Sequence, residues 1–170
     1  MNRVSWSLLG VMASGVPAAF VWWGLGRPSQ WLATERGLVL TEENATGRFQ
    51  VVAVFTLVGV VLGLVAGVLV QRITRSAQWQ TVVGLAGAAS AASLVCWRLG
   101  VWLGPQPVRD ATGLEVGDVV RDQFAVDTIV PFLLWPLAAV LGYTITLYLS
   151  SDGVDEDDEP SAEVSERSAP

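Results

Sequence analysis

The chain lacks histidine and lysine and has a single cysteine, Cys96, among its 170 residues. Without histidine, no imidazole can serve as a catalytic base. A lone cysteine excludes a disulfide within the chain, and it also excludes cysteine-rich zinc and iron–sulfur centres. We therefore expect no catalytic residues, no metal and no cofactor, and we predict that the chain is not an enzyme.

Charged residues are also scarce. They make up 15% of the chain, whereas about a quarter is usual for a soluble domain. Half of the 16 acidic residues lie after Ser151, so the preceding part is poorer still in charge. Hydrophobic residues make up 52% of the chain. This composition predicts a membrane protein.

Four apolar segments are each long enough to cross a bilayer as a helix, which takes about 20 residues. They lie at roughly residues 4–26, 51–70, 81–104 and 129–149. Backbone groups in lipid must be hydrogen-bonded within a segment, and no segment alternates as a barrel strand does. The first segment is longer than the apolar core of a signal peptide, so we expect a retained anchor. The predicted fold class is an all-α membrane protein with four transmembrane helices in a domain of residues 4–149.

Two long loops, residues 27–50 and 105–128, connect these helices at one end. The first loop has a hairpin pattern, in which β-type runs flank Glu35-Arg36-Gly37. The second loop alternates over residues 116–126, with a turn candidate at Gly117-Asp118. We expect the two loops to form a small β-containing cap over the ends of the helices.

The short link 71–80 and both termini lie at the other end of the predicted helices. The link has Arg72 and Arg75 and no acidic residue, and such a segment is usually cytoplasmic. We therefore expect a multi-pass protein of the plasma membrane with both termini in the cytoplasm, although similar arginine totals at the two ends leave the opposite orientation open. Residues 150–170 are acidic and cannot bury a core, so they are predicted to be disordered.

Small residues recur at helical spacing in the second and third apolar segments. Such residues let helices approach closely in lipid. Because a short link joins these two segments, we expect them to be antiparallel neighbours and favour packing within one chain over self-association. The residues are Gly59, Gly63 and Gly67 in the second segment and Gly84, Gly87 and Ala91 in the third.

Arg98 is the one charge inside the apolar segments. It lies within about 20° of Ala91 on a helical wheel, so we expect it to point into the bundle. A charge at this depth is costly and usually paired, and the candidate partners are Asp127, Glu42 and Glu43. Two interpretations stay open: Arg98 holds the loops onto the bundle, or it binds an anionic headgroup or substrate.

Tryptophans concentrate near the predicted ends of the helices, where such rings anchor proteins at the membrane–water interface. Proline in a helix removes a hydrogen bond and favours a kink, which we expect at Pro17, Pro131 and Pro136. The tryptophans near the long loops are Trp22, Trp23, Trp31, Trp97 and Trp102, and those at the other end are Trp6 and Trp79.

Three motifs resemble those of a small family of four-helix membrane proteins from high-GC Gram-positive bacteria, a family of unknown function. They are Glu42-Glu43 followed by GRF at 47–49, WRLGVWLGP at 97–105, and LWPLAA at 134–139. The resemblance covers residues 31–148 and implies a location in the plasma membrane. It implies no activity and no catalytic residues.

These observations lead to a functional expectation. We expect a non-enzymatic accessory or scaffolding component of the cell envelope, whose partners are the lipid bilayer and an envelope protein or a second copy of the chain, but not nucleic acid. The alternative is a small transporter or an anionic-lipid-binding protein that uses Arg98. Transporters commonly have broken helices, internal repeats or several buried ionisable groups, and the sequence has no convincing repeat.

Overall fold

The computed structural model describes residues 3–35, 37–40, 46–75, 78–105 and 115–151. Within these ranges, four helical segments are long and apolar enough to cross a membrane. The helices are α1 (Arg3–Ala13), α2 (Gly15–Leu25), α4 (Gly47–Thr74), α5 (Trp79–Leu103) and α6 (Val130–Ser151). The four predicted helices are therefore confirmed, and the predicted acidic tail, from residue 152 onward, lies outside the described residues.

The first of the four segments is interrupted at Ser14, between α1 and α2. Pro17 explains this position, because a proline has no N–H and its ring clashes with the carbonyl four residues earlier. That carbonyl belongs to Ala13, the last residue of α1. Pro131 lies in the first turn of α6, where a proline is tolerated, and Pro136 lies inside that helix.

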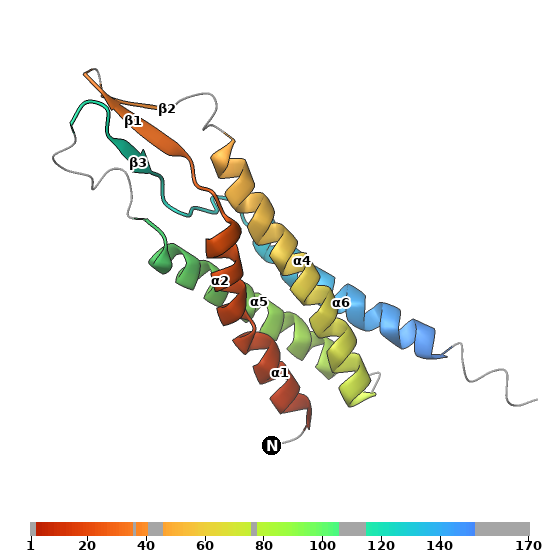
Figure 1. Ribbon diagram of the computed structural model, residues 1–170. Helices are drawn as coiled ribbons and strands as arrows, with labels where there is room; N and C mark the ends of the chain where they lie inside the picture. The colour runs from red at the N-terminus through yellow and green to blue at the C-terminus, as the bar shows by residue number, and fades with distance from the viewer. Residues whose placement is uncertain (1–2, 36, 41–45, 76–77, 106–114, 152–170) are drawn as a thin grey trace, which may run out of the picture.

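A small antiparallel sheet covers one end of the helices (Figure 1). Its strands are β1 (Gln30–Thr34), β2 (Gly37–Leu40) and β3 (Val119–Arg121), in the order β2-β1-β3. Thr34 pairs with Gly37, which confirms the hairpin. Gly117 has a φ of 102° in the turn before β3, a backbone conformation that favours glycine. Since β1 and β3 come from different loops, the predicted β-containing cap is confirmed.

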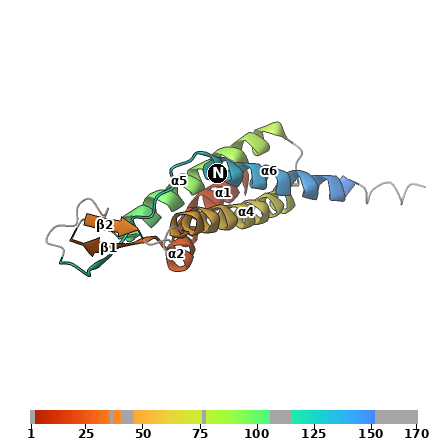
Figure 2. The same cartoon turned by 90° about the horizontal axis from the view of Figure 1, so that it is seen from above.

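The closest helix pair is α4 with α6, which lie side by side along the bundle (Figure 2). The expectation that α4 and α5 are antiparallel neighbours is wrong for most of their length, because few of their residues are in contact. A short link holds only the adjoining ends of α4 and α5 together, whereas α1 and α2 contact both helices. The glycine face of α4 therefore meets α6.

An aromatic core lies beneath the cap. The rings of Trp22 and Phe55 are 5.0 Å apart, and those of Phe55 and Trp135 are 5.4 Å apart. Trp22 is fully buried and donates a hydrogen bond from Nε1 to the carbonyl of Val51 at 2.8 Å. Its predicted place at the interface is wrong, because nearness to a helix end does not determine which way a side chain points. Trp23 and Trp102, by contrast, are exposed.

Candidate functional site

Arg98 lies on the outer face of α5, where its side chain is exposed. The expectation that it points into the bundle is wrong. Gly87 lies 11 residues before Arg98 and is therefore close to it on a helical wheel, but an added Cβ at Gly87 would have no neighbour within 4 Å. The packing face of α5 instead runs through Leu85, Ala89 and Cys96.

None of the predicted acidic partners is seen next to Arg98. Within the described residues Arg98 forms no ion pair. Asp127 lines a different hollow, together with Trp97 and Phe132. Glu42 and Glu43 lie outside the described residues.

The exposed side of Arg98 borders a groove of about 590 Å³, which we call the Arg98 groove. Trp102 and Gln123 also line it. A guanidinium group binds phosphate or carboxylate oxygens through paired hydrogen bonds, and an exposed indole suits the membrane–water interface. This groove therefore has the chemistry to hold an anionic group beside an apolar wall.

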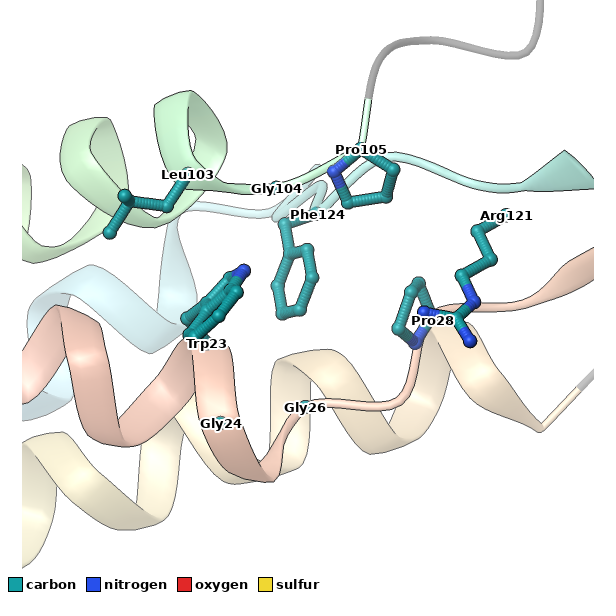
Figure 3. Close-up of a pocket in the computed structure, with 9 residues that line it drawn as sticks. All are labelled: Trp23, Gly24, Gly26, Pro28, Leu103, Gly104, Pro105, Arg121 and Phe124. Carbon is teal, nitrogen blue, oxygen red and sulfur yellow. The ribbon is translucent and has the colours of Figure 1, made fainter.

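A second groove, of about 540 Å³, lies on the other side of the end of α5 and contains Arg121, so we call it the Arg121 groove. Figure 3 shows Phe124 in the middle of this groove, with Trp23 on one side and Pro28 and Arg121 on the other. Gly104 and Pro105 line both grooves. The motif at 97–105 thus ends between two hollows, each with one arginine and one tryptophan.

An ion pair that the sequence did not indicate joins the loops to the bundle. Arg48 Nε of α4 lies 3.7 Å from Asp122 Oδ2, and the Asp122 side chain is 13% exposed. The amide of Asp122 also donates to the carbonyl of Ser29 at 2.8 Å. Arg48 and Asp122 therefore connect both loops to α4, which is the role that one interpretation assigned to Arg98. The two residues are far apart in the chain, and no local pattern links them.

The small residues of α4 and α5 differ in what they contact. Gly59, Gly63 and Gly67 are buried in α4, where added Cβ atoms would meet Trp135, Ala138 and the backbone of α6. Gly84 faces Leu8 of α1, Gly87 faces open space, and Ala91 is half-buried. The glycine stripe of α4 is thus covered by a helix of the same chain.

The described residues bring together no group of three or more His, Cys, Asp or Glu side chains that could hold a metal ion. No family model, curated protein or solved structure matches the chain. The resemblance carried by the motif at 97–105 therefore stays a prediction, and the functional argument depends on the geometry.

Proposed function

We propose that this chain is a multi-pass protein of the plasma membrane with both termini in the cytoplasm, and that it serves as a non-enzymatic accessory or scaffolding component of the cell envelope. Support for the membrane location comes from the outer faces of the helices. Exposed aliphatic side chains recur every fourth residue along α4 and α6. They are Leu57, Val61, Val65 and Leu69 in α4 and Leu133, Leu137, Leu141 and Ile145 in α6.

Helix length agrees with that location. The 28 residues of α4 extend over about 42 Å at 1.5 Å per residue, whereas the hydrocarbon core of a bilayer is about 30 Å thick. Both ends of α4 thus reach the headgroup regions. Arg48 lies at the cap end and Arg72 at the link end, where charged side chains meet water and headgroups.

The orientation can be tested by cysteine labelling of intact cells. In a Cys96→Ala background, a membrane-impermeant maleimide is expected to label Gly37→Cys in the cap and not Gly153→Cys in the tail. Permeabilised cells, in which both positions should react, provide the control. Labelling of Gly153→Cys alone in intact cells would show that the cap is cytoplasmic.

One observation carries the scaffolding role: an aliphatic row lies exposed on the cap sheet. Leu32 pairs directly with Val39 on one side and with Val119 on the other. Directly paired residues share a face of the sheet, and these three are 39%, 49% and 58% exposed. We call them the cap face. An apolar face above the helix ends suits contact with another envelope protein, because the transfer of aliphatic side chains from water to an apolar surface is favourable.

Crosslinking in native membranes tests this role. A photoreactive residue at Leu32 is expected to capture one defined neighbour, and Val39→Ser with Val119→Ser should abolish the adduct. A photoreactive residue at Leu57, on the outer face of α4, is the control and should give lipid adducts. If the Leu32 adduct is also lipid, or is unchanged by the serine substitutions, the scaffolding proposal is wrong.

A second candidate function is binding of an anionic lipid at the Arg98 groove. The observation that favours it is an exposed arginine without an ion-pair partner in the described residues, placed between Trp102 and Gln123. Arg98 lies about 9 Å from the Gly104 end of the helix, which its side chain can span toward the headgroups. Arg98→Ala is expected to reduce the anionic lipid that co-purifies, and Arg98→Lys to retain most of it. Lower thermal stability with unchanged lipid content would contradict this function.

A further inference from the structure

A further groove lies at the link end of the bundle, between the ends of α4 and α6. It has a volume of about 960 Å³, compared with about 590 Å³ for the Arg98 groove. Gln71, Arg72 and Arg75 line it from α4, and Thr146 and Ser150 line it from α6. We call it the link-end groove. No sequence motif pointed to it.

Gln71 is an unusual lining residue, because its side chain is 5% exposed and its Oε1 has no hydrogen-bond partner among the described residues. Leaving a buried polar atom unsatisfied is costly, because the atom loses its hydrogen bonds with water and gains none in return. In this orientation of the amide the buried atom is an acceptor, so it needs a hydrogen-bond donor that the described residues do not supply.

The neighbouring hydroxyl groups cannot supply that partner. Thr146 donates its hydroxyl hydrogen to the carbonyl of Gly142 at 2.8 Å, and Ser150 donates to the carbonyl of Thr146 at the same distance. A hydroxyl has one hydrogen, so neither side chain has a hydrogen left for Gln71 Oε1. The ligand must itself carry a donor, such as an alcohol.

Two arginines give the groove a positive charge. Arg72 lies in the last turn of α4, and Arg75 follows it in a left-handed conformation with φ 46°. Among the described residues, no acidic side chain lines the groove and none forms an ion pair with either arginine. Each helix C-terminus contributes about half a negative charge, so two full positive charges outweigh the ends of α4 and α6. The groove therefore favours an anion.

Apolar side chains continue the groove along the helices. Val68 and Ile145 line it on the side toward the middle of the bundle, where the outer faces of both helices are aliphatic. A ligand that fits therefore has a hydrocarbon part along the helices and an anionic, hydroxyl-bearing part at the helix ends. Free phosphate or a free sugar phosphate lacks the first of these parts.

We propose that the link-end groove binds an anionic phospholipid whose headgroup carries free hydroxyl groups, of the glycerol or inositol type. Arg72 and Arg75 hold the phosphate, and a headgroup hydroxyl donates to Gln71 Oε1. The inference rests on the proposed membrane location, and it places this lipid in the leaflet opposite the one that the Arg98 groove faces.

Native mass spectrometry in detergent can measure lipid binding to the full-length chain. A comparison of two lipids separates the effect of the headgroup charge from that of the headgroup hydroxyls. Phosphatidylglycerol and phosphatidylethanol carry the same charge, but only the former has headgroup hydroxyls. One additional hydrogen bond is worth about 0.5–1.5 kcal/mol, so the wild type is expected to bind phosphatidylglycerol about two- to twelvefold more tightly. Equal binding of the two lipids would overturn the role of Gln71.

Substitutions then assign the effect to residues. Gln71→Leu is expected to abolish the preference for hydroxyls without loss of thermal stability, because it removes an unsatisfied polar group. Arg72→Ala with Arg75→Ala should weaken binding of both anionic lipids toward that of zwitterionic phosphatidylcholine. Arg3→Ala, which removes an exposed arginine of α1 that does not line this groove, is the control and should leave the preference intact. Unchanged binding in the double arginine variant would overturn the site.

The acidic tail is the competing occupant of a basic groove at this end. Truncation after Ser151 is expected to leave the lipid ratios unchanged. If phosphatidylglycerol binds only after truncation, the tail fills the groove and the proposal is wrong. Failure of the membrane location would show separately, as a chain that does not fractionate with membranes.

Discussion

Replacement of Gly67 by alanine tests the contact between α4 and α6 most directly. A Cβ at Gly67 would lie against the carbonyl oxygen of Ala139 and 2.6 Å from the amide nitrogen of Tyr143. Both are backbone atoms of α6, so no side-chain rotation can make room. Gly87 on α5 is the matched control, because an added Cβ there would have no neighbour within 4 Å.

The size of the effect follows from the same geometry. Ordinary van der Waals contact begins near 3.4 Å. The 2.6 Å distance to the amide nitrogen of Tyr143 alone requires the helices to separate locally by at least about 0.8 Å, and a gap of that size forfeits a quarter to a half of the dispersion energy of the atoms involved. Overpacking of this kind destabilises by about 1–3 kcal/mol. Alanine is the better helix former by about 1 kcal/mol, but this gain applies equally to Gly87→Ala. We expect Gly67→Ala to be less stable than Gly87→Ala by about 1–3 kcal/mol.

Cys96 provides the assay, because it is the chain's single cysteine and is fully buried. A thiol-reactive fluorophore therefore reports unfolding of the detergent-solubilised protein on heating. At about 2–4 °C per kcal/mol for a chain of this size, the midpoint of Gly67→Ala should lie several degrees below that of Gly87→Ala. Equal midpoints would refute the close approach of α4 and α6.

Three further predictions concern other contacts of the same core and cap. Gly59→Ala should destabilise by about 1–3 kcal/mol, because its Cβ would meet the indole of Trp135, and Trp135→Leu in the same chain should recover part of the loss in a double-mutant cycle. Trp22→Phe keeps a ring in the core but removes the indole donor to the carbonyl of Val51 in α4, so the loss of one hydrogen bond, about 0.5–1.5 kcal/mol, is expected in the thiol assay. Asp122→Asn removes the charge opposite Arg48 and should cost no more than about 1 kcal/mol; a loss that persists in high salt would contradict an electrostatic role.

The secondary structure was largely predictable, because it depends on local properties of the chain. Apolar length predicted the helices, and the pattern around Glu35-Arg36-Gly37 predicted the hairpin. Observed helix ends differ by a few residues, as in α4, which begins at Gly47 and ends at Thr74. Hydropathy marks the apolar stretch alone, whereas polar residues at both of its ends continue the helix.

The candidate sites were less predictable. Arg98 was correctly singled out as an unusual charge, but its direction depends on which face of α5 the other helices cover. Gln71 attracted no attention in the sequence, since a glutamine near a helix end is ordinary. Its interest arises from burial without a hydrogen-bond partner, which depends on how α6 packs beside α4.

The sequence by itself determined that this chain forms four apolar helices and a small β cap, since segment length, hydrophobicity and turn residues are properties of neighbours in the chain. Only the tertiary structure decided that the glycine face of α4 meets α6, that Arg98 faces outward, and that Arg72 and Arg75 share a groove with Gln71. The physical reason is that a helix with apolar residues on every side can pack through any of its faces. The choice of face depends on shape complementarity between residues far apart in the chain, such as Gly59 and Trp135.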